Sequence, residues 1–402
     1  MKSLEVLLID DDPFQIELLT GQLDGLGCGK IRGFVDVAQA LDVLASQSAD
    51  IGLIFLDLNM PGTDGVEVLR RLADRRYDGS LVLISGEDSR IVEAAARLAR
   101  AHDLDILGWL AKPCGRGELS ALLDLWQETR KPVRHRSHKR YAPARIAQAI
   151  AQGELKNVYQ PKVFVRDGML AGVETLVRWQ HPQDGIVYPD QFIATAEEHG
   201  LIGRLTRTVI DRAIDQIGEW SAQGRRIPVA VNISMEDVSD PDFASYVLEA
   251  LDRGGVSPSE LTLEVTESRL MTNARAAMET LTRLRLRRVN LSIDDFGTGH
   301  SSLMQLRDLP FSELKIDRGF VHGAVSNATI AAIFDGSIDL ARRLGMTTVA
   351  EGVELEADWN WLGNKGCDIA QGYFVARPMA ADEVMAWARA WEAASVGSPK
   401  AG

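Results

Sequence analysis

The sequence predicts an α/β protein of two domains, a doubly wound parallel sheet followed by a closed barrel of alternating strands and helices. Compact apolar runs alternate with helix-like segments along the chain, which is typical of parallel sheets. The chain has 402 residues, more than one ordinary domain needs. A basic, proline-containing stretch without apolar periodicity interrupts the alternation after the first third, so we place the domain boundary there.

Four short apolar runs indicate buried strands in the first third of the chain, and they read EVLLI, GLIFL, LVLIS and ILGWL. Between them lie segments with helical periodicity, among them PFQIELLTGQL, VAQALDVLASQ and SRIVEAAARLARA. Asp12 and Pro13 suit the N-cap and the first position of the first helix. In open parallel sheets, ligands bind beyond the carboxyl ends of the strands, so we expect the site of this domain there.

Polar residues stand where these four strands end. Asp10 and Asp11 follow the first strand, Asp57 the second, Ser85 the third and Lys112 the fourth. The acids could hold Mg²⁺, Asp57 could accept a phosphoryl group, and Ser85 and Lys112 could bind its oxygens. Each residue alone could be a helix cap or a turn residue. The ordered set favours a cation and phosphate site.

Residues 125–142 are predicted to link the two domains. The stretch KPVRHRSHKRYAPAR within and just after them is basic and has two prolines. A solvated linker is the safer interpretation of such a short charged run, and a functional basic patch is the alternative. Residues 143–393 match the length of one TIM-like (β/α)8 barrel, about 250 residues. The tail 394–402 is predicted to be disordered.

In the second domain, six apolar runs end in polar residues. The runs are MLAGVETLVRW, IPVAVNIS, LTLEVTE, VNLSIDDFG, ELKID and TTVAEGVE. The polar residues are Glu174, Asn232, Glu264, Asp294, Asp295, Lys315 and Glu351. A parallel barrel brings the carboxyl ends of its strands to one face, so we expect these side chains to converge. Carboxylates in one pocket repel each other unless cations neutralise them, and we therefore predict a metal site.

The ligand types favour hard divalent cations. Carboxylate and amide oxygens suit Mg²⁺ or Mn²⁺, and no His lies in these strand-end runs, which disfavours zinc. Two cations about 3.5–4 Å apart could serve both the attacking water and the leaving oxygen of a phosphodiester. Asp294 and Asp295 would point to opposite faces of a regular strand, so we expect an irregular backbone before FGTG. Arg178 could grip a substrate phosphate bidentately.

Composition argues against several other classes of protein. The formal net charge of −13 disfavours direct nucleic-acid binding, because phosphate backbones favour basic surfaces. The cysteines Cys28, Cys114 and Cys367 are far apart and show no CxxC spacing, so we expect neither a disulfide framework nor a zinc site. No apolar run is long enough for a signal peptide or a membrane span. We therefore expect a cytoplasmic location and no membrane insertion.

Residues 1–124 resemble the receiver domain of bacterial response regulators. The resemblance rests on the acid pair after the first strand, the D-x-x-M-P-G-x-D-G stretch, the Ser/Thr position and the Lys-Pro dipeptide. It implies that a cognate sensor histidine kinase phosphorylates Asp57 and that Asp10 and Asp11 hold Mg²⁺. Trp109 falls where the family often places a switch aromatic, usually Tyr or Phe. The predicted fold of this domain is accordingly flavodoxin-like.

Residues 143–393 resemble the EAL-domain phosphodiesterases, which hydrolyse cyclic di-GMP to linear pGpG. The naming motif reads ETL here and begins at Glu174. The chain also contains YQPK, VNIS, LEVTES, DDFGTG, KID, VAEGVE and CDIAQGYFVARP in that order, and it has no GGDEF-type synthase motif. The order of the two domains resembles response-regulator phosphodiesterases. That likeness implies control through Asp57 and assembly into a homodimer or higher homo-oligomer.

The resemblance also implies a role for each site residue of the barrel. The first of two Mg²⁺ or Mn²⁺ ions would be held by Glu174, Asn232, Glu264 and Asp294. The second would share Asp294 and take Asp295 and Glu351. The catalytic groups would be Glu351 as candidate general base, Lys315 beside the attacking water, and Glu174. Substrate contacts would come from Gln160, Lys162, Leu176, Arg178 and Gln371.

The loop FGTGHSS after the aspartate pair is a predicted control point. The resemblance implies that Glu267 tethers this loop, which contains Gly297 and Gly299 and follows Asp295 in the sequence. Two positions depart from the family pattern. Thr175 replaces the usual Ala, and strand alternation turns it away from Glu174, so we expect little effect. His300 stands where a Tyr is common and could alter the order of the loop.

Two other functions stay open at this point. A non-catalytic receptor would signal by binding cyclic di-GMP, but degenerate family members usually lack several metal ligands and this chain keeps them all. A protein-interaction switch would use the barrel only as a scaffold. Turnover in the presence of metal separates the phosphodiesterase from both.

Overall fold

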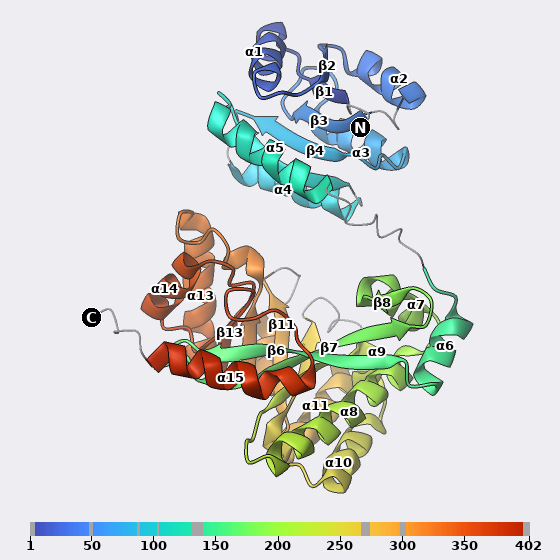
Figure 1. The fold of residues 1–402 in the computed structure, drawn as a ribbon, viewed down its shortest axis with the longest axis vertical. Helices are drawn as coiled ribbons and strands as arrows, with labels where there is room; N and C mark the ends of the chain where they lie inside the picture. The colour runs from blue at the N-terminus through green and yellow to red at the C-terminus, as the bar shows by residue number, and fades with distance from the viewer. Residues whose placement is uncertain are drawn as a thin grey trace. The chain divides into compact units, whose positions relative to one another are not determined.

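The computed structural model describes residues 5–47, 51–86, 89–102, 104–130, 140–266, 274–297 and 303–396. The chain forms two compact units, Met1–Ser137 and His138–Gly402, which Figure 1 shows as a sheet with flanking helices and a barrel. The predicted α/β class is therefore confirmed. Half of the predicted linker, residues 131–139, lies outside the described residues, as does most of the predicted tail. The first six residues of that linker, 125–130, instead belong to the last helix of the first unit.

The first unit contains a five-stranded parallel sheet in the order β2-β1-β3-β4-β5. Its strands are β1 Glu5–Ile9, β2 Lys30–Phe34, β3 Ile51–Asp57, β4 Ser80–Ser85 and β5 Asp105–Ala111. Its helices are α1 Pro13–Asp24, α2 Val37–Gln47, α3 Gly65–Asp74, α4 Ser89–Ala101 and α5 Arg116–Arg130. As expected, Asp12 caps α1, accepting from the Phe14 N–H at 2.9 Å, and Pro13 is its first residue.

Alternation along the central strands builds a core on each face of this sheet. In β1, Leu7 and Ile9 join one buried cluster, whereas Val6 and Leu8 join another, because successive side chains of a strand point to opposite faces. Strand β2 has no compact apolar run and was not among the predicted strands. It lies at the edge of the sheet and is partly exposed, so its side chains need not be apolar.

The second unit contains a closed ring of eight strands, which are β6 Leu155–Phe164, β7 Leu170–His181, β9 Val229–Asn232, β10 Leu261–Thr266, β11 Asn290–Phe296, β12 Glu313–Ile316, β13 Thr347–Ala350 and β14 Ile369–Gln371. The β6–β7 pairing closes the ring, and β8 Gly185–Val187 forms a hairpin with β7. The α-helices are α6 Pro143–Ala151, α7 Ile193–Glu198, α8 Ile202–Ala222, α9 Met235–Ser239, α10 Phe243–Gly254, α11 Ala274–Leu286, α12 Leu303–Asp308, α13 Ala328–Leu344, α14 Glu356–Lys365 and α15 Ala381–Val396. Short 3₁₀ turns cover Pro189–Gln191, Pro258–Glu260 and Arg318–Phe320.

The barrel departs from an all-parallel barrel at one strand. Strand β6 pairs antiparallel with both of its neighbours, β7 and β14. The other pairings around the ring, in the order β7-β9-β10-β11-β12-β13-β14, are all parallel. The predicted TIM-like barrel is therefore confirmed, with β6 as the one strand of the ring that runs against its neighbours. Residues along β6 pass from the rim of the carboxyl-end face into the interior as the chain proceeds.

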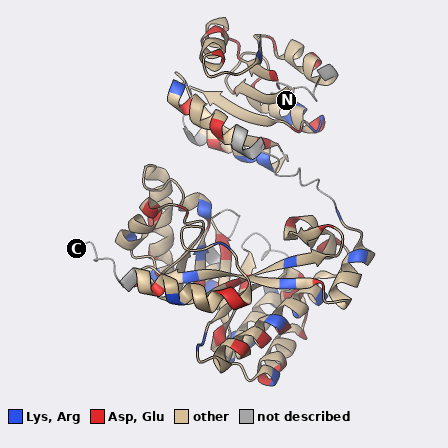
Figure 2. Cartoon of the chain, viewed as in Figure 1, with Lys and Arg blue, Asp and Glu red and all other residues tan. Residues whose placement is uncertain are grey.

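Helices cover the outside of the barrel, and α8, α10 and α11 pack side by side there (Figure 1). Large buried aromatic side chains, including Trp179, Trp220 and Phe243, fill the space between strands and helices. Figure 2 shows Lys and Arg interspersed with Asp and Glu over the helices of both units. Over the described part of the chain, no helix combines the length and apolar character needed to cross a membrane.

Replacing Gly65 by Ala is expected to lower the free energy of unfolding of the first unit by about 1–3 kcal/mol. The new Cβ would lie 2.6 Å from Cα of Leu58 and 2.7 Å from the carbonyl oxygen of Asp57, so backbone would have to move. Urea unfolding followed by circular dichroism measures the change. The control is Gly86→Ala, whose Cβ would meet no atom within 4 Å. Equal stability of the two variants would contradict this packing.

Candidate functional site

The residues predicted to form one site in the first unit lie together at the carboxyl ends of its strands. Carboxylate oxygens of Asp10, Asp11 and Asp57 lie within 4.8 Å of one another. The ammonium of Lys112 is 2.8 Å from Asp10 Oδ2 and 2.9 Å from Asp57 Oδ2. Ser85 ends β4 and accepts the backbone N–H of Lys112 at 2.9 Å. This geometry suits a cation beside a phosphoryl acceptor.

The charges of this site are strongly coupled. Burial raises the pKa of Asp10, against the opposing hydrogen bond from Lys112. Burial would lower the pKa of Lys112, but its hydrogen bonds to Asp10 and Asp57 raise it, so the ammonium stays charged. Three carboxylates with one ammonium leave an excess of negative charge that a divalent cation would neutralise. The predicted switch residue Trp109 is 39% exposed on β5, so much of its ring faces solvent.

In the second unit, the ammonium of Lys315 lies at the centre of the predicted site. Its Nζ is 2.7 Å from Glu351 Oε1, 2.8 Å from Glu264 Oε2, 3.0 Å from Asp294 Oδ1 and 3.8 Å from Glu174 Oε2. These side chains come from β12, the residue after β13, β10, β11 and β7. Lys315 is 1% exposed. Four carboxylates from four other strands thus converge on one buried positive charge.

One ammonium does not balance the carboxylates around it. Burial raises the pKa of Glu174, and it raises the pKa of Glu351 to about 8, in both cases against the attraction of Lys315. For Glu264, burial would also raise the pKa, but Lys315 and Lys162 together hold it below the usual value. Full ionisation of these carboxylates is therefore unfavourable with Lys315 and Lys162 alone, and an added divalent cation would favour it, as expected for a metal site.

The backbone is irregular at the aspartate pair, as the sequence predicted. Asp295 has a φ of +56°, and the pairing of β11 with β12 shifts register between Ile293 and Phe296. A non-glycine residue in this left-handed region costs of the order of 1–3 kcal/mol and is typical of functional sites. Its result is that oxygens of Asp294, Asp295 and Glu351 lie within 4.8 Å of one another.

Side-chain amides hold the carboxylate of Glu174 from both sides. Asn232 Nδ2 donates to Glu174 Oε1 at 2.8 Å, and Gln371 Nε2 donates to Glu174 Oε2 at 2.6 Å. Gln371 also donates to Gln160 Oε1 at 3.2 Å, and Gln160 donates to the carbonyl oxygen of Ala376 at 3.1 Å. Predicted residues from β6, β7, β9 and β14 therefore form one network, and the side-chain carbonyl oxygen is the atom through which Asn232 could bind a cation.

An acidic cavity of about 240 Å³ opens above this network. It is lined by Gln160, Glu174, Asp294, Lys315, Arg318, Glu351, Gly352, Glu354, Gln371, Gly372 and Tyr373. The sequence reasoning did not single out Arg318, Glu354 and Tyr373. Arg318 directly follows KID, Glu354 completes VAEGVE, and Tyr373 follows QG at the end of β14. All three follow a strand-end motif or complete one, and this position in the sequence could have identified them.

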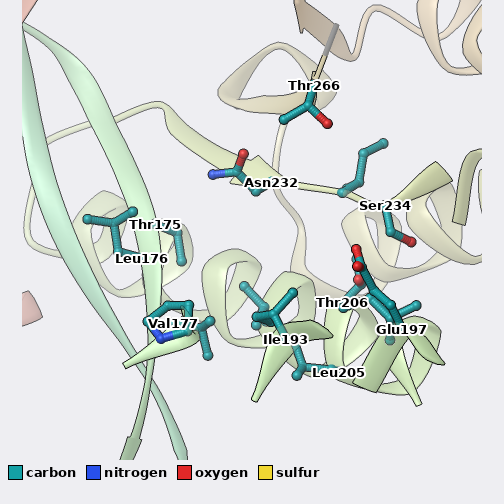
Figure 3. Close-up of a pocket in the computed structure, with 14 residues that line it drawn as sticks. Thr175, Leu176, Val177, Ile193, Glu197, Leu205, Thr206, Asn232, Ser234 and Thr266 are labelled. Carbon is teal, nitrogen blue, oxygen red and sulfur yellow. The ribbon is translucent and has the colours of Figure 1, made fainter. Parts of the chain in front are cut away.

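Figure 3 shows a second, largely apolar cavity, whose volume is about 350 Å³. Its lining residues are Thr175, Leu176, Val177, Pro189, Ile193, Glu197, Ile202, Leu205, Thr206, Val209, Asn232, Ile233, Ser234 and Thr266. Figure 3 shows Thr175, Leu176 and Val177 on one side of it and Ile193 and Leu205 on another. Asn232 joins the two cavities, because it lines this one and contacts Glu174 of the other. Leu176, a predicted substrate contact, lies here.

Arg178 is not among the residues that line either cavity. Its guanidinium lies over the ring of Tyr188, 4.9 Å from the centroid, and donates to the carbonyl oxygen of Val177 at 2.9 Å. A phosphate contact by Arg178 stays a prediction. Thr175 is turned away from Glu174 as expected, and its buried hydroxyl has no hydrogen-bond partner among the described residues.

Lys162 lies inside the barrel rather than in the acidic cavity. Its Nζ is 3.3 Å from Glu264 Oε1 and 3.6 Å from Glu313 Oε1, and the residue is 5% exposed. The cavity it lines, of about 230 Å³, is at the other end of the strands. Because β6 runs antiparallel to its neighbours, Lys162 lies deeper than Gln160. The predicted direct contact of Lys162 with a substrate stays a prediction.

Part of the predicted loop control falls on residues that the structure does not describe. Glu267, Gly299 and His300 lie outside the described residues. Gly297 is described, has a φ of +96°, and would place an added Cβ 2.7 Å from the ring of Phe320. Conformation and space both require glycine at 297, whatever the role of the loop.

Family comparisons agree with this arrangement. The EAL domain family matches residues 144–378, and the response regulator receiver domain family matches residues 6–124. The chain belongs to the EAL domain family and carries a receiver domain. Cyclic di-GMP phosphodiesterase RocR of Pseudomonas aeruginosa is 31% identical over 381 residues, which cover 94% of this chain and 97% of RocR. The predicted family and domain order are therefore confirmed.

The EAL domain also has close structural relatives. Bifunctional diguanylate cyclase/cyclic di-GMP phosphodiesterase MucR of Pseudomonas aeruginosa is 43% identical over 60% of this chain, but the match covers only 35% of MucR. The structure "PaMucR Phosphodiesterase, c-di-GMP complex" has a TM-score of 0.57 and 42% identity, and it covers 60% of this chain and 98% of that chain. The match to the EAL domain thus holds in sequence and in fold.

Replacing Lys315 by Met is expected to lower the free energy of unfolding of the EAL domain by about 3–5 kcal/mol in EDTA, because buried carboxylates lose their counter-charge. Mg²⁺ or Mn²⁺ should restore part of this loss by binding the folded state. Urea unfolding followed by tryptophan fluorescence, with and without metal, measures both effects. The control is Lys156→Met, at an exposed position of β6. A Lys315→Met variant as stable as the parent in EDTA would contradict the central role of this ammonium.

Proposed function

We propose that the EAL domain of this chain hydrolyses cyclic di-GMP to linear pGpG with two divalent cations, Mg²⁺ or Mn²⁺, and that phosphorylation of Asp57 controls the rate. The observation that carries the proposal is the convergence of Glu174, Glu264, Asp294 and Glu351 on Lys315 at the carboxyl-end face of an EAL barrel. RocR and MucR are both named as cyclic di-GMP phosphodiesterases, which supports the choice of substrate.

The donor set fits two hard cations. Oxygens of Asp294, Asp295 and Glu351 are close enough to share one ion, and Asp294 would also join Glu174, Asn232 and Glu264 around the other. Bound divalent cations supply polarisation of the phosphoryl group and stabilise both the attacking and the leaving oxygen. Glu351 lines the acidic cavity, and its carboxylate would accept a proton from the attacking water there.

Lys315 has a defined part in this chemistry. Its Nζ holds Glu351 Oε1 at 2.7 Å and Asp294 Oδ1 at 3.0 Å, so it fixes the proposed base relative to the metal ligands. Its charge would also offset the negative charge that develops on the phosphoryl oxygens. Both effects need the ammonium to be buried and immobile, which its 1% exposure provides.

The adjoining cavities suit a nucleotide. The acidic cavity would hold the phosphodiester through its metals, and Arg318 places a positive charge in its lining. The apolar cavity beside it has the volume and lining for a planar base, since it measures about 350 Å³ and Leu176, Pro189 and Ile193 contribute to its wall. Small-molecule sites usually combine such an apolar pocket with a few polar groups.

The receiver site would transmit a signal from a sensor histidine kinase. Asp57 is 2% exposed and contacts Lys112, with Asp10 and Asp11 beside it, an arrangement that suits a phosphoryl acceptor with one Mg²⁺. The complete ligand set of the EAL domain favours an enzyme over a receptor that only binds cyclic di-GMP or an interaction switch. Assembly into a homo-oligomer stays a prediction.

Purified full-length protein is expected to release pGpG from cyclic di-GMP with Mg²⁺ or Mn²⁺ and to release none in EDTA. Replacing Glu351 by Gln should lower kcat by about 10²–10⁴-fold, the usual contribution of a general base. Chromatographic separation of products measures both. The control is Glu356→Gln, an exposed residue of α14 outside the cavity lining. Tight binding of cyclic di-GMP without turnover, with both metals present, would favour a receptor instead.

Beryllofluoride, a phosphoryl mimic, is expected to change kcat/KM for cyclic di-GMP by at least about threefold in the parent protein. The reason is that it would bind Asp57 between Lys112 and the cation and so stabilise one state of the receiver. Asp57→Asn should abolish the change while leaving metal-dependent turnover intact. The same response in the parent and in Asp57→Asn would show that control does not pass through this carboxylate.

A further inference from the structure

The carboxylate of Glu264 is held between two ammonium groups at different depths of the barrel. Its Oε2 is 2.8 Å from Lys315 Nζ, and its Oε1 is 3.3 Å from Lys162 Nζ. Glu264 is 0% exposed, and Lys162 is 5% exposed. Lys315 faces the other carboxylates of the acidic cavity, whereas Lys162 lines the cavity at the opposite end of the strands. Glu264 is therefore fixed from above and from below.

The reversed direction of β6 places Lys162 at this depth. Gln160, two residues earlier on the same face of the strand, lines the acidic cavity. Two residues of strand span about 6.8 Å, and Lys162 pairs in register with Gly172 of β7 and Gln371 of β14. Its backbone is therefore held on both sides by neighbouring strands. Its side chain approaches Glu264 from the end of the barrel opposite the acidic cavity.

Lys162 has its own counter-charge, so it does not simply add positive charge to the site. Glu313 Oε1 is 3.6 Å from Lys162 Nζ and makes no hydrogen bond within the described residues. Glu313 and Lys315 lie two residues apart on β12. Lys162 and Glu313 thus form a pair without net charge below the metal ligands. The contribution of this pair to Glu264 is a directed N–H group of Lys162 rather than a net charge.

We propose that Lys162 is a positioning residue for the metal site: through Glu264 it fixes the orientation of one ligand and thereby raises the affinity of the EAL domain for its divalent cations. This rests on the proposed metal-dependent hydrolysis. With Oε1 held by Lys162, the other oxygen of Glu264 faces Lys315 and the remaining ligands. Groups that orient a metal ligand in this way typically contribute about 10–100-fold to metal affinity.

The test is a charge-balanced double substitution, Lys162→Met with Glu313→Gln. It removes one positive and one negative charge from the same layer, so the net charge inside the barrel is unchanged and the bond to Glu264 is lost. Free Mn²⁺ is measured by electron paramagnetic resonance during titration of full-length protein. Every protein in the series carries Asp11→Asn and Asp57→Asn, which remove two acids of the receiver cluster. The dissociation constant for Mn²⁺ is expected to rise about tenfold.

Steady-state kinetics separates positioning from substrate contact. At saturating Mn²⁺, KM for cyclic di-GMP should stay within about twofold of the parent. A raised KM with unchanged Mn²⁺ affinity would overturn the proposal and show that Lys162 contacts the substrate. If neither value changed, Lys162 would have neither a positioning role nor a substrate contact, and the proposal would also be refuted. The matched control removes the exterior pair Lys365–Asp335, 2.8 Å apart, by Lys365→Met with Asp335→Asn, and it should leave Mn²⁺ affinity unchanged.

Folding and the parent reaction are checked independently. If the double variant does not unfold cooperatively on heating, Lys162→Gln with Glu313→Gln replaces it. That pair retains two polar side chains in the layer but no ammonium, and a rise of at least threefold in the Mn²⁺ dissociation constant is expected. A parent that binds Mn²⁺ but does not release pGpG would refute the proposed function while leaving the metal comparison valid. Equal Mn²⁺ affinity of parent and variant would refute the role of Lys162 alone.

Discussion

The rest of the EAL domain depends on the contacts of one buried ammonium, that of Lys315. Four carboxylates from four other strand ends meet it within 3.8 Å, and such a cluster forms only if the barrel closes with the register observed. A slip of one residue in any of these strands would turn its carboxylate to the outer face. Removing the ammonium would leave buried charges without compensation, which is costlier than losing an exposed ion pair. Fold and site are therefore set by the same contacts.

The antiparallel strand β6 explains why the interior of this barrel has two charged layers. A parallel strand contributes polar groups to the carboxyl-end face mainly from its last residues. Strand β6 enters at that face, so Gln160 joins the rim network and Lys162 continues below it. The closing strand thus supplies an amide to the upper layer and an ammonium to the lower one. Glu264, on β10, lies between these layers and is the only described carboxylate for which contacts with both Lys162 and Lys315 are seen.

The sequence was sufficient to predict that the polar strand ends converge, but not to predict every residue and contact around them. Glu174, Glu264, Asp294 and Glu351 could be predicted because each follows an apolar run and parallel strands share one face. An irregular backbone at Asp294 and Asp295 could be predicted because two consecutive carboxylates had to reach the same side of the strand, but the left-handed conformation of Asp295 was not specified. The direction of β6 could not be predicted, because the pattern of side chains along a strand does not show whether it pairs parallel or antiparallel with its neighbours. Arg178 shows the remaining limit, because spacing places it near Glu174 but cannot tell that its guanidinium also lies over the ring of Tyr188.

The receiver and the EAL domain solve one electrostatic problem in the same way. Each gathers more carboxylates than its single central lysine can balance, Asp10, Asp11 and Asp57 around Lys112 in one and four carboxylates around Lys315 in the other. A lysine suits this place because its compact ammonium can contact several oxygens at once, whereas the planar fork of arginine favours one bidentate partner. The ammonium keeps the carboxylates together in the absence of metal. The remaining negative charge then makes cation binding favourable. In the receiver, a phosphoryl group on Asp57 would add negative charge, and Lys112 and the cation would already be in place to stabilise it.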